Sequence, residues 1–598
     1  MQKLNVAAFG VLKNKGQINC TQAVLNSGLF ENLAEGNMKV AKDAVFINES
    51  VFNNVGNLEI EGQLANNANG STLNNNGTIT LIGVFNNNGT FTNNKKLLML
   101  EGVLAEFNNY FVVNNTQDSL MNLGGQFINF EGQINNYGFL FVTYIMDVKE
   151  FSFLNNYYEF FNFSIINNYG TLTNAGLFIN NGNINNLING VINNSATIII
   201  YINSVFSNMA FFSNTLTGET SIENDGVLNN HNQFNTDGLV TNNGTFVNFM
   251  EGTITNNGTM NNRNMLENKG TLLSVGTYIN STSGETLNSA SFTTSGLVDN
   301  LVGTFTNDAT GTLTVDATGV FQNSAAFTNR NIFNVSGNFS NLDTFLNEAS
   351  GQVTIFSGGT CENNETFTNE GGLTNNNNGT CANNKNFLLN GLISNAGLFT
   401  NNFVCEILGN FQNISQGEVN NFHGIVIKGE GSLTNNYGGN VVNEFLQVNS
   451  EIEALCFFTI IESGSLSNLG GTFTNKGFCQ NQTLITNSLD GNIINTGNFI
   501  NENEVYNEGS ITSSSFFLND GILNNFNLLL NTNQFFNYGT IVNNFDIYNY
   551  TNNGNFVNSG AILNLGRFNS ADGSSTCGTA LYSGNEPAPN ARGTTCPP

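Results

Sequence analysis

Residues 243–262 read Asn-Gly-Thr-Phe-Val-Asn, Phe-Met-Glu-Gly-Thr-Ile-Thr-Asn and Asn-Gly-Thr-Met-Asn-Asn, which are three versions of one short phrase. Each version has a turn that ends in Gly, followed by Thr, an apolar residue, and a return to Thr or Asn. The same phrase recurs from one end of the chain to the other. Self-similarity at this short period indicates one small structural unit that is stacked many times.

Glycines in these turns give the length of the repeat. Gly252 and Gly258 mark neighbouring turns, and Gly270 marks the turn three such segments after Gly252. Gly371 and Gly391 show the same relation with a small turn insertion. Three segments therefore make one coil of about 18–20 residues, close to the shortest periods of solenoid repeats.

Within each segment, Thr, an apolar residue and Thr alternate over about four residues, which is the period of a β-strand with one buried face. The frequent turns leave no room for helices or long strands, and only four Pro residues are present to interrupt backbone pairing. We therefore expect an all-β fold: a single long parallel β-solenoid of three-sided coils, with the apolar residue pointing inward.

Asn accounts for 122 of the 598 residues. Stacked coils place like residues over like residues, so we expect the turn Asn to form amide ladders along the axis. AT-rich coding is an alternative source of the Asn excess, but it does not explain the phasing.

The repeat covers residues 1–570, which we interpret as one domain because a solenoid grows by adding coils. Residues 571–598 hold all four Pro residues and the pair Cys577 and Cys596, and they lack the strand phrase. We interpret them as a C-terminal tail or cap. A Cys577–Cys596 disulfide is left open, and it would indicate an oxidising, extracellular setting. The early start of the repeat also leaves open that the chain is a fragment.

A second cysteine pair occupies equivalent positions of two repeats. Gly-Thr-Cys-Glu-Asn-Asn at residues 359–364 recurs as Gly-Thr-Cys-Ala-Asn-Asn at 379–384, so Cys361 and Cys381 fill the same inward slot one coil apart. Adjacent coils are close enough for a disulfide. The same slot elsewhere holds Phe246 or Leu313, which favours the alternative that both cysteines are small buried hydrophobes.

The charge balance excludes some partners. The chain has 16 Lys and Arg against 43 Asp and Glu, a net charge of −27, which leaves too few cations for a nucleic-acid footprint. The longest apolar stretch, residues 196–212, contains Asn203 and Asn208 and is expected to form strands rather than a membrane helix. We expect no nucleic-acid partner and no membrane insertion.

The densest group of acids near a histidine consists of Glu219, Glu223, Asp225, His231 and Asp237. Glu219 and Asp237 are separated by the shortest predicted coil length, a spacing that would stack them on one face as an acid and a base. However, Asp225 and Asp237 each precede Gly in the turn position that Asn fills elsewhere, which favours a turn role. We therefore expect no catalytic residue.

No cofactor or metal site is expected either. His231 and His423 are far apart in sequence and have no cysteine at metal-ligand spacing, and no Gly-rich loop with Lys is present. The aromatic-rich stretches are interpreted as core stacks rather than sugar platforms; they include Tyr157, Tyr158, Phe160, Phe161 and Phe163, and Phe535, Phe536 and Tyr538.

The segments Gly303-Thr304-Phe305-Thr306-Asn307 and Gly311-Thr312-Leu313-Thr314 resemble the repeats of large secreted adhesins, in particular filamentous-haemagglutinin-like proteins and autotransporter passenger domains. The resemblance covers roughly residues 10–570 and is one of repeat style. It implies a right-handed β-helix that is displayed on a surface and binds host or neighbouring cells.

We therefore predict a non-enzymatic extracellular or cell-surface fibre. Its repeated outward Asn and Thr faces would bind surface polysaccharide or glycoprotein, because multivalency multiplies weak contacts. Two alternatives stay open: a fibre or spike on a virion surface, and a β-helical polysaccharide lyase or hydrolase. Homo-oligomerisation or end-to-end self-association is also left open.

Overall fold

The computed structural model describes residues 4–68, 70–101, 105–443, 447–448, 451–452, 457–544, 546–549, 555–565, 567–570, 575–577 and 581–584. These residues form short strands and turns and no helix, so none of them forms a helix that could cross a membrane. The chain divides into two compact units, Met1–Phe292 and Thr293–Pro598. The coil architecture described below holds within each unit.

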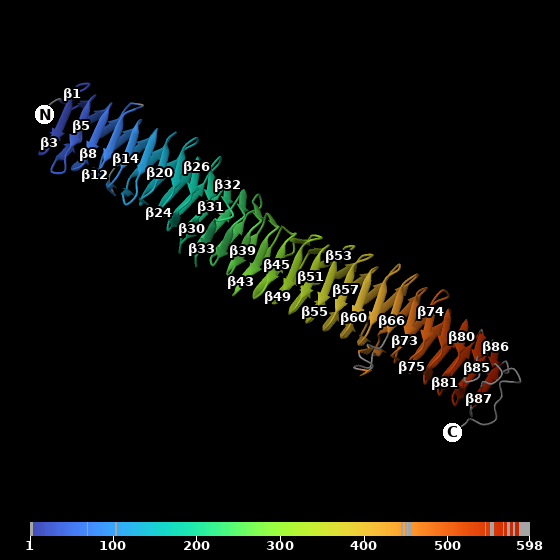
Figure 1. Ribbon diagram of the computed structural model, residues 1–598. Coiled ribbons are helices and arrows are strands. Elements are labelled where there is room, and N and C mark those ends of the chain that lie inside the picture. The colour runs from blue at the N-terminus through green and yellow to red at the C-terminus, as the bar shows by residue number, and fades with distance from the viewer. Residues whose placement is uncertain are drawn as a thin grey trace. The chain divides into compact units, whose positions relative to one another are not determined.

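Three short strands make one coil. In the first unit, β34 (Val227–Asn230), β35 (Gln233–Thr236) and β36 (Leu239–Asn242) follow one another, and β37 (Thr245–Asn248) returns to pair in parallel with β34. Repetition of this path gives three parallel sheets and about 27 turns (Figure 1). The predicted all-β parallel β-solenoid with three-sided coils is confirmed.

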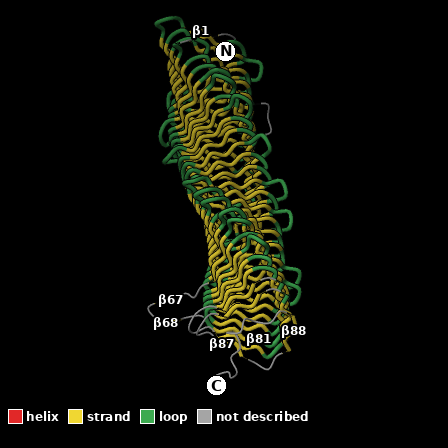
Figure 2. The backbone as a smooth tube through the Cα atoms, turned by 90° about the vertical axis from the view of Figure 1, so that its right-hand side faces the viewer, coloured by secondary structure: helices red, strands yellow, loops and turns green. Residues whose placement is uncertain are grey.

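We name the three sheets by their first strands. The first sheet begins with β1 (Leu4–Val6), the second with β2 (Val11–Asn14) and the third with β3 (Gln17–Cys20). Figure 2 shows the strands of successive coils lying side by side, with loops at the corners where the chain passes from one sheet to the next.

Coil length varies more than the sequence predicted. The interval from Val45 to its parallel partner Gln63 agrees with the prediction, whereas the interval from Lys96 to its partner Leu120 exceeds it by several residues. One coil in the second unit is longer still, because β64 (Gly424–Ile427) pairs with β69 (Phe457–Ile460) across the inserted antiparallel pair β67 (Gln447–Val448) and β68 (Glu451–Ile452). The additional residues lie between strands, so the register within the sheets is kept.

Alternation along each strand decides which side chains are buried. In β37, Phe246 and Asn248 are buried, whereas Thr245 and Val247 point outward. Apolar residues fill the second strand position of most strands in both units, with Thr220 and Thr286 as exceptions, and their rings often stack between coils: the centroids of Phe327 and Phe345 are 4.7 Å apart. Burial of one such side chain stabilises the fold by about 1.5–3 kcal/mol.

The fourth strand position holds a buried asparagine in most strands, and these residues form ladders. The side-chain Nδ2 of Asn208 donates to Oδ1 of Asn230 at 2.8 Å, Asn230 donates to Asn248 at 2.8 Å, and Asn248 donates to Asn268 at 2.8 Å. Each amide also donates to backbone carbonyl oxygens, as Asn230 does to Asn232 O at 2.9 Å. A fully buried polar side chain is thereby paired along the whole row.

The predicted amide ladder is therefore present, but its main position differs from the prediction. The buried ladders use the last residue of the strand, not the turn residue beside Gly. Turn asparagines such as Asn257 are exposed, and the Nδ2 of Asn257 donates to Oδ1 of Asp237 outside the core at 2.8 Å.

Glycine recurs at many corners, where neighbouring coils approach each other closely. A Cβ added to Gly258 would lie 2.2 Å from the carbonyl oxygen of Gly238, which is the equivalent residue one coil earlier. No side chain fits at that distance. The recurrent Gly of the sequence phrase thus keeps the backbones of neighbouring coils within hydrogen-bonding range.

Part of the predicted tail, residues 571–598, continues the strand pairing. β87 (Ser575–Cys577) pairs with β84 (Asn555–Asn558), and β88 (Leu581–Gly584) pairs with β85 (Ala561–Asn564). The proposed Cys577–Cys596 disulfide lies outside the described residues.

The ladder predicts a large difference between two adjacent asparagines of β34. Asn230→Ala removes a buried amide and leaves the Oδ1 of Asn248 and the Nδ2 of Asn208 without their ladder partners, so we expect a loss of about 2–4 kcal/mol in the free energy of unfolding. Asn229→Ala changes an outward side chain and is expected to cost less than about 0.5 kcal/mol. Urea unfolding, with hydrogen exchange resolved by peptide over β31 (Val205–Asn208), β34 and β37, measures both. Equal losses for the two variants would contradict a structural role for the ladder.

Candidate binding groove

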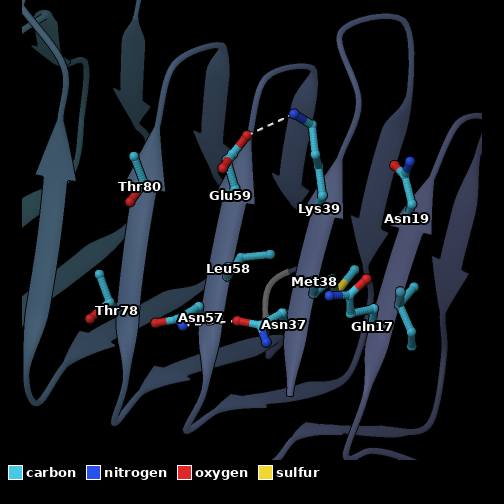
Figure 3. A pocket seen from close by; sticks show the side chains of 11 residues that line it. Gln17, Asn19, Asn37, Met38, Lys39, Asn57, Leu58, Glu59, Thr78 and Thr80 are labelled. Atoms are coloured by element: carbon cyan, nitrogen blue, oxygen red, sulfur yellow. Dashed lines mark hydrogen bonds and ion pairs between the residues drawn. The ribbon is translucent and has the colours of Figure 1, made fainter. Parts of the chain in front are cut away.

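The outer face of the third sheet is hollowed in the first unit. The groove spans β3, β6 (Asn37–Val40), β9 (Asn57–Ile60) and β12 (Thr78–Leu81) and has a volume of about 480 Å³ (Figure 3). Because these strands pair in parallel and in register, the outward side chains of each coil lie beside those of the next. The groove therefore presents two parallel rows of side chains.

The first row is neutral. It consists of Gln17, Asn37, Asn57 and Thr78, the first residues of the four strands. The exposed Nδ2 of Asn57 donates to Oδ1 of Asn37 at 2.9 Å, which fixes the orientation of both amides. Three amides and a hydroxyl thus offer donors and acceptors at the spacing of the strands, about 4.8 Å.

The second row contains the only charges that line the groove. Lys39 Nζ lies 2.8 Å from Oε1 of Glu59 and 2.6 Å from Oε1 of Glu61, which is beyond the groove. The hydrogen bonds that the Lys39 ammonium donates to Glu59 and Glu61 raise the pKa of Lys39 above its ordinary value. The Lys39 ammonium forms ion pairs with both carboxylates. Asn19 and Thr80 are the neutral members of this row.

Aromatic side chains gather on the same sheet several coils further along the first unit. The interpretation of residues 157–163 as a core stack is wrong for most of them: Phe160 is fully buried, but Tyr157, Tyr158 and Phe163 are each about 45% exposed. In the second unit, likewise, Phe535 is buried and Tyr538 is exposed. Strict strand alternation allows only every second residue to point inward.

These outer rings face one another rather than solvent. Phe141 and Phe161 are stacked with centroids 4.9 Å apart and planes 8° from parallel, and Tyr137 and Tyr157 are stacked at 4.7 Å. A ring stacked on the ring of the neighbouring coil exposes mainly its edge. Sugar rings dock on aromatic faces, so this surface is a poorer sugar platform than its composition suggests.

Comparison with protein-family models and with curated proteins gave no match. The resemblance to adhesin repeats therefore stays one of repeat style, and the function has to be argued from the groove and the outward faces.

The five residues of the acidic group are distributed around the coil. Glu219 begins β33 (Glu219–Ile222) and pairs with Leu239, the first residue of β36. Asp237 lies in the turn before β36 and accepts a hydrogen bond from Asn257. The predicted stacking of Glu219 on Asp237 is wrong, because this coil has the longer of the two predicted lengths and the stacking assumed the shorter.

The other members of that group have local roles. Glu223 accepts a hydrogen bond from Ser221 Oγ at 2.7 Å, and Asp225 occupies a turn with φ of 61°. His231 stacks on Phe249 with centroids 4.1 Å apart. Among the described residues, no group of three or more His, Cys, Asp and Glu side chains is placed to hold a metal ion.

The inward cysteines are free thiols. Cys361 and Cys381 pair in register in neighbouring strands of the second unit, and both are buried without a disulfide. The hydrogen bond with Cys381, together with burial, raises the pKa of the Cys361 thiol well above its usual value. Burial likewise raises the pKa of Cys405 and of Cys479. The interpretation of Cys361 and Cys381 as buried hydrophobes is the one that the structure supports.

The sequence pattern did not single out the groove residues. Gln17, Asn37, Asn57 and Thr78 become a row only when the strand register is known, because the intervals between them are not uniform. These residues could have been found from the sequence if the buried residue at the end of each strand had been recognised. The outward residues are then those one and three positions before it.

The buried thiols predict a loss of stability at alkaline pH. Cys405 and Cys479 have folded-state pKa values above the ordinary 9.0, so their stabilising contribution is complete below pH 9 and declines as the pH rises above it. Each contributes a decline of about 1.4 kcal/mol per pH unit above 9, because the unfolded thiols ionise and the folded ones do not. We expect Cys405→Val with Cys479→Val to unfold in urea with a weaker dependence on pH between about 9 and 11. An unchanged pH dependence in the double variant would contradict the prediction that these two thiols reduce stability at alkaline pH.

Proposed function

We propose that this chain is a non-enzymatic binding protein of the extracellular space or a cell surface, and that the groove on its third sheet binds polysaccharide. The observation that carries the proposal is the neutral row Gln17, Asn37, Asn57 and Thr78, repeated over four coils in a groove of about 480 Å³. Carbohydrate hydroxyls both donate and accept hydrogen bonds, as do amides and hydroxyls.

Repetition supports a polymeric ligand. Equivalent side chains recur at each strand of the sheet, so a repeating ligand finds the same partner at each step. Individually weak contacts then add through a high effective concentration once the first is made. Outward Asn residues also form pairs on the second sheet, such as Asn53 and Asn74, but these residues do not line this groove and are not assigned to the ligand.

Charge narrows the ligand class. The chain carries a net charge of −27, and the single ammonium in the groove is paired with two carboxylates. Acidic polysaccharides would be repelled at low ionic strength. We therefore expect neutral polysaccharides to bind better than sulfated or uronate-rich ones.

Binding to a panel of soluble and immobilised neutral and acidic polysaccharides tests the proposal. Asn37→Ala with Asn57→Ala removes the bonded amide pair of the groove, and we expect about tenfold weaker binding or more from the lost hydrogen bonds. Asn53→Ala with Asn74→Ala is the matched control, because it removes another outward pair, bonded at 2.9 Å, from the second sheet of overlapping coils.

Two outcomes would reject this assignment. Equal loss of binding in both double variants would place the ligand elsewhere. Release of shortened sugar products, abolished by Glu219→Gln or Asp237→Asn, would show an enzyme in place of a binding protein.

A further inference from the structure

Among the residues whose side chains the structure describes, five ladder asparagines are also the first residue of an Asn-x-Ser/Thr triplet, the acceptor sequence for N-linked glycosylation. They are Asn48, Asn162, Asn280, Asn413 and Asn481, followed two positions later by Ser50, Ser164, Thr282, Ser415 and Thr483. All five asparagines have no exposed surface. An acceptor triplet is compatible with glycosylation only where its Asn stays at the surface.

The atom that would be modified is the one that holds the ladder. Asn48 Nδ2 donates to Asn66 Oδ1 at 2.8 Å and to Thr72 O at 3.0 Å. Asn413 Nδ2 donates to Asn435 Oδ1 at 2.9 Å and to Gly417 O at 2.8 Å. These bonds leave no space beside the nitrogen, because the next coil packs directly against it.

Glycan transfer at these positions would be incompatible with the coil. The reaction joins Nδ2 to the anomeric carbon of an oligosaccharide, breaks the bond from that carbon to a lipid pyrophosphate, which leaves with the electron pair, and releases one Nδ2 proton. The product has one N–H instead of two and carries a sugar where the next asparagine must lie. Because transfer occurs on chains that have not yet folded, burial in the final structure gives no protection.

We propose that native folding of this chain requires the five ladder triplets to stay unglycosylated. The chain folds only along routes that do not transfer oligosaccharide to Asn-x-Ser/Thr before the coils form. If the chain is extracellular or on a cell surface, it reaches that location by a route that does not add N-linked glycans to the ladder triplets. The inference is independent of what the groove binds.

The chain contains an internal comparison set. Asn76, Asn257 and Asn378 are exposed turn residues that also begin acceptor triplets, in each case Asn-Gly-Thr. A glycan on any of them would extend into solvent. Asn88 and Asn243 begin triplets of the same kind and are partly exposed. Glycosylation at these turn triplets is therefore expected to be tolerated.

The test compares the full chain made in the bacterial cytosol with the same chain directed, behind a cleavable signal peptide, through a glycosylating secretory pathway. Site occupancy is mapped by peptide mass spectrometry, and folding is measured by β-type circular dichroism and protease resistance. We expect folded protein from the cytosol, and from the secretory route a product that carries glycans at ladder triplets and is not folded.

Two sets of substitutions locate the cause, and all of them keep every ladder Asn. The ladder set is Ser50→Ala, Ser164→Ala, Thr282→Ala, Ser415→Ala and Thr483→Ala. The turn set is Thr78→Ala, Thr90→Ala, Thr245→Ala, Thr259→Ala and Thr380→Ala. Both sets are first made in the cytosol to show that they fold. We expect the ladder set alone to restore folded protein in the secretory route.

Three results would overturn the proposal. One is secreted wild-type protein that is folded while its ladder triplets carry glycans, whereas folded protein with empty ladder triplets agrees with the proposal. Another is restoration by the turn set. A third is failure of the ladder set to restore folding although it folds in the cytosol.

Discussion

Burial of a side-chain amide in this interior depends on partners for its carbonyl and for both N–H bonds, because each buried polar group left unpaired costs about 1–3 kcal/mol. The ladders meet this condition by passing each hydrogen bond to the equivalent residue one coil later, as from Asn208 to Asn230 to Asn248. A register slip of one residue would place every ladder amide outside and every outward residue inside. The ladder therefore fixes the register, and differences in coil length are absorbed at the corners.

The ladder also has a direction, and its consequences are visible where a row begins. Nδ2 donates toward the later coil, so the first asparagine of a row has no amide donor behind it. Asn168, Asn242 and Asn375 follow Val148, Ile222 and Ile355 in their rows, and the Oδ1 of each has no hydrogen-bond partner. These three starts each carry the cost of an unpaired carbonyl, whereas at Asn162 and Asn481, which also follow an apolar residue, Oδ1 accepts the backbone N–H of the residue two positions later.

The third sheet of the first unit contains both kinds of residue at the strand end, and after Asn162 and Asn180 the row returns to Ile200 and Ile222 before Asn242. From Cys20 to Val142, every strand of that sheet ends in Cys or an apolar residue, and asparagine begins only at Asn162. A small hydroxyl residue can accept the ladder hydrogen bond, as Thr236 Oγ1 does from Asn214 and Ser274 Oγ does from Asn256, each at 3.1 Å. Thr236 does not continue the ladder, because its Oγ1 donates to Gly238 O and the Oδ1 of Asn256 has no hydrogen-bond partner. At the fourth strand position, a row made only of apolar residues and a row made only of asparagines each leave few polar groups unpaired. Stability is lost where the two kinds of residue are mixed within one row.

The repeat phrase was sufficient to predict the parallel solenoid, the three-sided coil and the inward apolar position, because strand alternation and close stacking at Gly follow from local chemistry. It was not sufficient for the strand-end asparagine, which composition rules assign to turns and surfaces. That omission accounts for the other errors. Without a fixed inward fourth position, Tyr157, Tyr158 and Phe163 were assigned to the core, and an assumed coil of the shortest length placed Glu219 on Asp237.

Function is consequently separated from folding along each strand. The second and fourth positions are committed to the core and the ladder, so variation that does not disturb the fold is confined to the first and third positions and to the corners. In the third sheet of the first unit those positions change from the neutral groove of Gln17, Asn37 and Asn57 to the stacked rings of Phe141 and Phe161 while the sheet itself continues. Asparagine occurs at outward and at inward strand positions, and the consequences differ. An outward amide can bind a ligand, whereas the Nδ2 of an inward amide such as Asn48 or Asn413 donates to its neighbours, so a chemical change at that nitrogen is a change to the fold.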